Sequence, residues 1–190
     1  MGEVEGQIRD ERLDAEREAR RQIALTQVRQ YPDPVLRMRA NEVSEFDDTL
    51  RALVDRMGRL MQEARGVGLA APQLGILQRV LVYQVAEDAP VVPLVNPQRV
   101  EESEERETAD EGCLSLGAAS VVVPVERPVS VAVEARSPDG QPVRVEADGL
   151  EARVIQHELD HLDGVLTIDR TTPEARKQAL GELRPQPILG

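Results

Sequence analysis

Apolar residues recur every three or four positions in one stretch of the chain, between residues 48 and 66. This spacing is typical of a helix with one buried face. Asp47 or Asp48 can cap its start, because an aspartate side chain accepts hydrogen bonds from the free amides of the first turn. Gly66 is a natural stop. The pattern predicts an N-terminal amphipathic helix whose buried face is formed by Leu50, Leu53, Val54, Met57, Leu60 and Met61.

Short runs rich in β-branched residues follow this helix, which is typical of strands. A turn-forming stretch at residues 137–140 would join the last two runs as a hairpin. A second helix is predicted from Asp148 to a stop at Gly164. This order of elements favours an α+β domain with antiparallel or mixed β-sheets over a wound parallel sheet. The predicted strands are residues 79–85, 91–95, 121–123, 129–135 and 142–146.

Two charged stretches interrupt the apolar pattern. Residues 1–22 hold five arginines and seven acids, and we interpret them as a charged N-terminal extension, helical or frayed, rather than as a partner-binding arm. Residues 23–190 would then form the folded domain. Residues 101–110 hold six acids and one arginine, which predicts a solvated surface loop. Helix-compatible charge pairs in the extension are Asp14 with Arg17, Glu16 with Arg20, and Glu18 with Arg21.

Composition narrows the classes of function. The chain has 190 residues, a net charge of −12, no Trp, one Phe and two Tyr, so its core must be aliphatic. Negative charge and few aromatic side chains argue against direct nucleic-acid binding. A lone cysteine cannot form an internal disulfide, which fits a reducing compartment. The acidic N-terminus lacks a signal region, and no apolar run reaches membrane-spanning length. We therefore expect a cytoplasmic protein without a membrane partner.

The two histidines and the cysteine of the chain form a candidate metal site. On a helix His157 and His161 lie on one face with Val154, so both imidazoles could bind one cation, with Glu158 beside it as a general base. Two core histidines without a metal would explain this string equally well. Cys113 favours the metal, because three ligands leave the open fourth position of a catalytic site, whereas a structural site takes four.

A third string, residues 66–73, is rich in glycine and alanine. Small residues let the backbone approach a ligand or another backbone closely. Gln73 ends the string with an amide that can donate a hydrogen bond to a developing oxyanion. A glycine cap after the first helix would explain Gly66 without any functional role, so this string alone is a weak indication of function.

Taken together, the three strings resemble the signature of the peptide deformylase family. The family motif Gly-x-Gly-x-Ala-Ala-x-Gln matches residues 66–73, Glu-Gly-Cys-Leu-Ser matches residues 111–115, and Gln-His-Glu-x-Asp-His matches residues 156–161. The resemblance extends from about residue 24 to residue 172 and leaves the charged extension outside. It implies hydrolysis of the N-formyl group from the initiator methionine of nascent polypeptides, with release of formate.

The resemblance also implies roles for individual residues. Cys113, His157 and His161 would bind one divalent metal ion, usually iron(II), with nickel, cobalt or zinc as alternatives. The second predicted helix would thus be a central metal-binding helix, with Glu158 as general acid and base. Gln73 and the backbone N–H of Leu114 would stabilise the oxyanion. Candidates for the pocket that receives the formyl group and the methionine side chain are Gly66, Val67, Gly68, Leu114 and Val154.

The chain departs from the family pattern at two places. Gly117 and Ser120 stand where family members usually have a proline and an arginine, on the side where the substrate peptide would bind. Residues 173–190 are neither long nor strongly basic, so docking on ribosomes through a basic C-terminal helix is not expected. N-formylmethionyl peptides, including nascent chains at the ribosome, are the expected partners.

Two other functions remain open at this stage. A zinc endopeptidase could use the His-Glu-x-x-His string, although its third ligand would normally lie downstream as His or Glu, rather than upstream as Cys113. A non-catalytic module that binds a metal or senses redox state through the cysteine is the other alternative. In such a module Glu158 and Gln73 would have no role.

Overall fold

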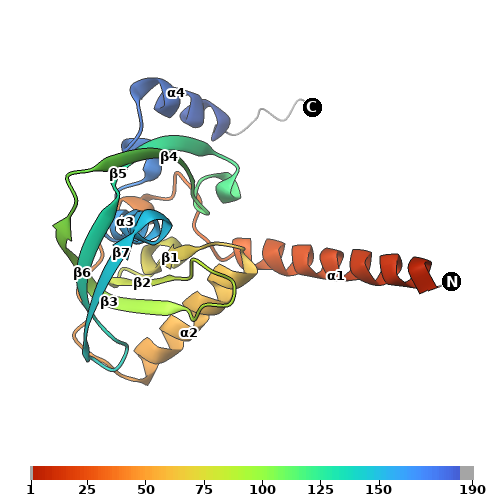
Figure 1. Ribbon diagram of the computed structural model, residues 1–190, viewed down its shortest axis with the longest axis horizontal. Coiled ribbons are helices and arrows are strands. Elements are labelled where there is room, and N and C mark those ends of the chain that lie inside the picture. Colours follow the sequence, from red (N-terminus) through yellow and green to blue (C-terminus); the bar gives the residue numbers. More distant parts are fainter. Residues whose placement is uncertain (1, 185–190) are drawn as a thin grey trace.

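The computed structural model describes residues 2–184, and their side chains from residue 14 onward. These residues form four α-helices and seven strands, with the strands in two antiparallel sheets (Figure 1). The predicted α+β class is confirmed. The only parallel pairing among the described residues is an isolated bridge between Asn41 and Gln78. The larger sheet has the order β1 (Gly68–Ala70), β2 (Val80–Tyr83), β3 (Val92–Glu102), β6 (Ser130–Arg136) and β7 (Pro142–Asp148), and the smaller one pairs β4 (Arg106–Gly112) with β5 (Val122–Pro128).

The larger sheet is covered on both faces. Strand β2 shows this most clearly, because its four residues are all buried. Val80 and Val82 pack into the cluster that contains α2 (Asp48–Glu63), whereas Leu81 and Tyr83 pack into the cluster that contains α3 (Gly149–Leu162). Successive side chains of a strand point to opposite faces, so a continuous apolar run fits a strand between two helices.

Helix α2 is the predicted amphipathic helix. The Asp47 side chain accepts a hydrogen bond from the Leu50 N–H at 3.0 Å, as expected of an N-cap. The helix ends at Glu63, just before Gly66. Of the six predicted core residues only Leu53 is partly rather than fully buried. The 3.6-residue period was therefore sufficient to predict both the helix and its buried face.

Helix α3 lies between the two sheets (Figure 1). It contacts β1, β2, β6 and β7 of the larger sheet and β5 of the smaller one. Asp148 is its N-cap residue and the helix ends before Gly164, both as predicted. Gly164 has a φ of +75°, and a Cβ there would lie 2.6 Å from the carbonyl oxygen of Arg37. Glycine is thus required where the chain leaves this helix.

The prediction of a loop at residues 101–110 is wrong, because most of this stretch belongs to two strands. Strand β3 continues to Glu102, and β4 begins at Arg106 and pairs residue by residue with β5. The stretch is nevertheless solvated, as predicted. Glu111 is the one fully buried residue of β4, so no alternation of apolar and polar residues marks the strand. Backbone pairing with β5 stabilises this strand despite its charges.

Residues 2–25 form one helix, α1 (Gly2–Leu25), which projects from the body (Figure 1). The three predicted charge pairs are present along it, at 3.3–3.9 Å. Its last turn differs from the rest, because Ala24 and Leu25 are buried in the cluster that contains α2. The charged helix therefore continues without a break into the core.

One helix was not predicted, α4 (Pro173–Glu182). It packs through Ala179 into a cluster with β5 residues, and its apolar residues are too few to form a clear stripe. Thr172 caps it by accepting a hydrogen bond from the Ala175 N–H at 3.2 Å. In the part of the chain that the structure describes, no helix is both long and apolar enough to cross a bilayer.

Candidate metal centre and active-site pocket

The three predicted metal ligands come together in space. Cys113 directly follows β4, and His157 and His161 lie one turn apart on α3, with ring centroids 5.0 Å apart. One ligand atom from each residue can be chosen so that all three lie within 4.8 Å of one another. The Cys113 sulfur is 3.2 Å from Nε2 of His161. Local helix geometry aligns the two imidazoles, and the β4–β5 hairpin brings the sulfur to them.

The donor set fits a transition-metal ion. One sulfur and two imidazoles suit iron(II), cobalt, nickel or zinc, and three protein ligands leave a coordination position open. His161 is 2% exposed, and Nδ1 of its ring has no hydrogen-bond partner among the described residues. Burial lowers the pKa of His161 well below its usual range, which keeps the ring neutral, as a ligand must be.

His157 is oriented by a buried carboxylate. Its Nδ1 lies 3.0 Å from Oε2 of Glu111, a contact that leaves Nε2 for the metal. Burial opposes a positive charge on this ring, but the hydrogen bonds with Cys113 and Glu111 raise its pKa well above the ordinary value. A metal ion bound at Nε2 would take the place of that proton.

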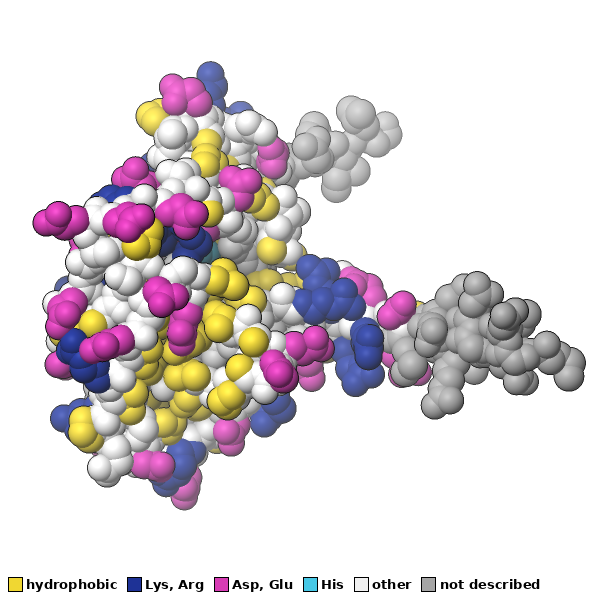
Figure 2. Space-filling model, viewed as in Figure 1, with side chains coloured by type: hydrophobic (Ala, Val, Ile, Leu, Met, Phe, Trp, Pro, Cys, Tyr) yellow, Lys and Arg dark blue, Asp and Glu magenta, His cyan; other side chains and the backbone are white. Residues whose placement is uncertain are grey.

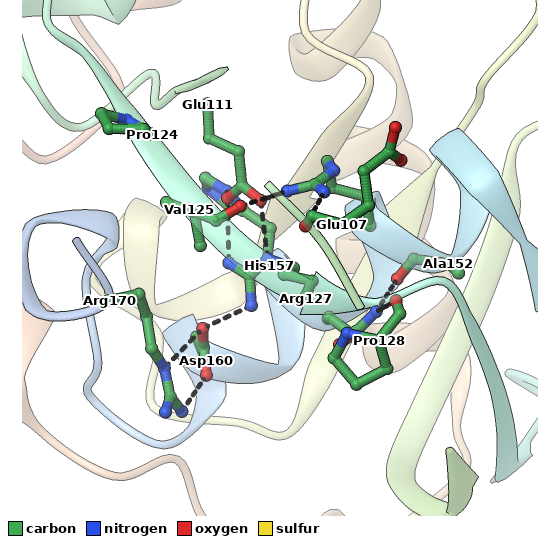
Figure 3. A network of polar contacts seen from close by, with 12 residues as sticks. Glu107, Glu111, Pro124, Val125, Arg127, Pro128, Ala152, His157, Asp160 and Arg170 are labelled. Atoms are coloured by element: carbon green, nitrogen blue, oxygen red, sulfur yellow. Dashed lines mark hydrogen bonds and ion pairs between the residues drawn. The ribbon is translucent and has the colours of Figure 1, made fainter. Parts of the chain in front are cut away.

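Glu111 belongs to an ion-pair network (Figure 3). Arg127 donates to both of its oxygens, at 2.6 and 2.9 Å, and Arg153 donates to it at 2.8 Å. Arg127 also donates to Asp160 at 2.9 Å, and Asp160 accepts from Arg170 at 2.7 Å. Burial opposes the negative charge on Glu111, yet the hydrogen bonds from Arg127 and the His157 ring outweigh it and lower its pKa to about 2. We did not predict this network from the sequence.

Glu158 lies beside the ligands in a different environment. It is 4% exposed, and its Oε2 has no hydrogen-bond partner among the residues described. Burial raises its pKa to about 7, although the nearby charges of His157 and Arg127 act in the opposite direction. A Cβ on Gly68 would collide with the Glu158 carboxylate, so the second glycine of residues 66–73 makes room for it.

The Gln73 amide is held from both ends. Its oxygen accepts a hydrogen bond from the Ala70 N–H at 2.9 Å. Its nitrogen donates to the Ser115 hydroxyl at 3.1 Å and lies 3.8 Å from the Cys113 sulfur. The amide N–H groups therefore point toward the metal ligands, where a donor to an oxyanion would be required.

A cavity of about 250 Å³ connects these groups. All five predicted pocket residues line it, together with Gln73, Cys113, His157 and Glu158. His161 is not among the lining residues. Leu150 and Arg153 also line the cavity and were not predicted, although both precede His157 at helical spacing, which could have revealed them. On the face that Figure 2 shows, hydrophobic side chains gather over β1, β2 and β3. The five predicted residues that line the cavity are Gly66, Val67, Gly68, Leu114 and Val154.

The segment that departs from the family pattern is a left-handed turn. Gly117, Ala118 and Ala119 have φ values of +60°, +54° and +69°. Proline is locked near −65°, so it could not take the place of Gly117 in this backbone. Ala119 lines the cavity, whereas Ser120 is exposed. A Cβ at residue 117 would lie 2.5 Å from the Ser120 hydroxyl, so the glycine and the serine are matched to each other.

The chain is similar in sequence and in structure to known proteins. The family model described as polypeptide deformylase matches residues 25–177. The chain is 44% identical over 156 residues to the peptide deformylase of Natranaerobius thermophilus, covering 82% of this chain and 98% of that protein. It is 47% identical over 162 residues to that of Acidothermus cellulolyticus, covering 85% and 87%. A crystal structure of the Synechococcus elongatus peptide deformylase in complex with actinonin has a TM-score of 0.77 at 42% identity, covering 82% of this chain and 85% of that one.

Proposed function

Because the chain belongs to the polypeptide deformylase family, which removes the N-formyl group from nascent polypeptides, we propose that Cys113, His157 and His161 hold one divalent metal ion for this hydrolysis. The observation that carries the proposal is the cluster of the three ligands, two of which line one cavity together with Glu158 and Gln73. Family membership sets aside the endopeptidase and the redox-sensing module. Helix α3 is then the central metal-binding helix.

A metal ion held by these three residues would supply Lewis acidity and would lower the pKa of a water molecule toward neutrality. We propose iron(II) as the physiological ion, with nickel, cobalt or zinc as substitutes. Support comes from the mixed sulfur and imidazole donors, which suit all four ions. Glu111 supports the site, because its hydrogen bond to His157 fixes the orientation of that ring.

Glu158 acts as general acid and base in this proposal. Its pKa of about 7 lies near neutrality, where a carboxyl group can both accept and return a proton. It takes the proton of the attacking water and delivers it to the leaving amine. The carbon–nitrogen bond of the formamide breaks, formate leaves, and the methionine amine is released. A carboxylate without protein hydrogen bonds at Oε2 is suited to this exchange.

Gln73 and Leu114 stabilise the oxyanion of the tetrahedral intermediate. The Gln73 nitrogen already faces the ligand cluster, and Leu114 follows Cys113 directly on the cavity wall. Loss of one such donor costs about 2.7–4 kcal/mol in comparable hydrolases. The formyl group and the methionine side chain occupy the cavity between Gly66, Gly68 and Val154.

N-formylmethionyl peptides, including nascent chains at the ribosome, are the substrates in this proposal. Residues 1–22 form an extension outside the catalytic domain, which is consistent with a family match that begins at residue 25. The described helix α4 carries Arg176 and Lys177 against Glu174 and Glu182, so it offers no excess of positive charge for binding ribosomal RNA. We therefore propose that helix α4 does not act as a basic docking helix in the processing of nascent chains.

Metal removal and reconstitution test the proposal. We expect anaerobically purified protein to release formate from formyl-Met-Ala-Ser, to lose this activity on chelation, and to regain it with iron(II), cobalt or nickel. Cys113→Ser should bind markedly less metal by elemental analysis, because a hydroxyl replaces the thiolate ligand. Chelated wild-type protein is the control for folding by circular dichroism. Full metal content in the variant would exclude Cys113 as a ligand, and cleavage of unformylated peptides would favour a peptidase.

A further inference from the structure

The orientation of the Leu114 N–H is set by the carbonyl of the same peptide group. The Cys113 oxygen accepts two hydrogen bonds, from the Leu116 N–H and the Ala119 N–H, each at 2.9 Å. In a trans peptide the C=O and N–H bonds point in opposite directions. Two donors that hold the Cys113 oxygen therefore also fix the direction of the Leu114 N–H, which points the opposite way within the peptide plane.

One of these donors comes from a strained segment. Ala119 is the last of three consecutive residues in the left-handed region, and two of the three are alanines. Residues with a Cβ rarely adopt this conformation, and it persists only where surrounding contacts hold it. The position of the Ala119 N–H thus depends on groups outside the turn.

Gln30 supplies such contacts from a distant part of the chain. Its side-chain oxygen accepts a hydrogen bond from the Ala118 N–H at 3.2 Å, and its nitrogen donates to the Leu114 carbonyl at 2.8 Å. One amide thereby spans the start and the middle of the segment that follows Cys113. Its neighbours bond backbone to backbone nearby, with the Arg29 N–H donating to the Gln73 carbonyl and the Tyr31 N–H to the Ser115 carbonyl.

We propose that Gln30 is a positioning residue for deformylation. It holds the turn at residues 117–119 and, through the Ala119 hydrogen bond to Cys113, the direction of the Leu114 N–H. It does not line the cavity itself. The inference rests on the proposed role of the Leu114 N–H as an oxyanion donor, and it adds the contact by which a residue 84 positions earlier maintains that donor.

The alternative is a purely structural role, because Gln30 is an exposed residue and its contacts could serve only to attach two surface segments. The two roles differ in their kinetic effect. A positioning role acts in the transition state, so kcat falls while KM changes little. A structural role lowers the thermal midpoint of unfolding without a specific loss of kcat well below that midpoint.

The test compares Gln30→Ala and Gln30→Glu with the control Gln27→Ala, whose side chain bonds only Arg56 among the described residues. We expect Gln30→Ala to lower kcat roughly 10- to 100-fold with KM within about twofold of wild type, since a displaced donor loses part of its effect. Metal content should not change. Gln30→Glu retains an acceptor for Ala118 but no donor for Leu114, so its kcat should lie between wild type and Gln30→Ala.

Three results would overturn the inference. They are an unchanged kcat in Gln30→Ala, an equal loss in Gln27→Ala, and a raised KM with kcat intact, which would make the turn only a wall of the cavity. Failure of the metal assignment would appear separately, as normal metal content in Cys113→Ser. The kinetic assay therefore distinguishes the role of Gln30 from the proposal on which it rests.

Discussion

Glu111 and Glu158 are two glutamates near the histidine pair that differ in their surroundings. Both line the cavity and they are 6% and 4% exposed, but only Glu111 belongs to the ion-pair network. Burial opposes the charge on both. The pKa of Glu111 is nevertheless lowered to about 2, whereas that of Glu158 is raised to about 7. Two glutamate side chains with similarly low exposure thus have pKa values that are shifted in opposite directions.

The difference comes from the partners. Glu111 accepts hydrogen bonds from Arg127 and Arg153 and contacts the His157 ring, so its charged form is stabilised. One oxygen of Glu158 has no such partner among the described residues. A permanent anion suits the orientation of a metal ligand, and a carboxyl that titrates near neutrality suits proton transfer. Helix α3 therefore carries one histidine that a permanent anion orients and, next to it, a carboxyl group that is suited to proton transfer.

The largest expected effect is on kcat and comes from replacing Glu158, which lines the cavity. Glu158→Ala should lower kcat for formate release by about 10²- to 10⁴-fold, the usual contribution of a general acid–base group. Metal content should be retained, because Glu158 is not among the three ligands. The measurement is steady-state deformylation of a formylated tripeptide together with elemental analysis.

Glu158→Gln is the matched control, because it preserves the size of the side chain and removes only its ability to exchange a proton. It should be as slow as Glu158→Ala and at least as stable as wild type to urea. Wild-type turnover in either variant would remove Glu158 from the mechanism.

The second-largest expected effect is on stability and comes from replacing Glu111 in the ion-pair network. Glu111→Ala leaves the buried guanidinium group of Arg127 and the partly buried one of Arg153 without their shared carboxylate. Breaking a buried pair in this way should lower the free energy of unfolding by about 3–5 kcal/mol. Urea unfolding followed by circular dichroism measures it. Glu107→Ala on the same strand is the control, because the Glu107 side chain is exposed and should change stability by no more than about 0.5 kcal/mol. An equal loss of unfolding free energy in Glu111→Ala and Glu107→Ala would show that the ion-pair network around Glu111 does not stabilise the protein.

The smallest expected effect is on the pH dependence of stability in chelated protein. Both carboxyls have an ordinary pKa of 4.5. Glu111 has a lowered folded-state pKa, so its contribution of about 3 kcal/mol is present above pH 4.5 and is lost as the pH falls toward 2. The folded-state pKa of Glu158 is raised instead. Its contribution to the free energy of unfolding, of similar size, is therefore present below pH 4.5 and is lost as the pH rises through 7.

Urea titrations between pH 2 and 8 separate the two contributions. Glu158→Gln should abolish the loss of stability above pH 4.5 and retain the loss toward pH 2. Glu111→Gln should show the reverse. A Glu158→Gln protein that still loses the same stability above pH 4.5 would show that another group titrates there.

Several parts of the fold could be predicted from local patterns. Helices α2 and α3, strands β2 and β6 and the turn at residues 137–140 follow local patterns. Each is marked by a buried face, by a continuous apolar run (β2) or by a left-handed glycine. Strand β4 and helix α4 were missed. Strand β4 is mostly exposed and acidic, and α4 buries little beyond Ala179, so neither has a periodic apolar signal.

Some residues of the candidate site could likewise be predicted from the sequence, whereas others could not. The sequence by itself determined that His157, Glu158 and His161 share one helical face, because helix geometry requires it. It also indicated Cys113 as a third ligand and Gln73 as an oxyanion donor, and the resemblance to a family strengthened both assignments. Only the tertiary structure decided which glutamate is charged and which side chain supports the Leu114 peptide. Arg127, Arg153 and Gln30 lie 16, 42 and 84 residues from their partners. A pKa or a peptide orientation depends on such neighbours in space, and no local pattern in the sequence records them.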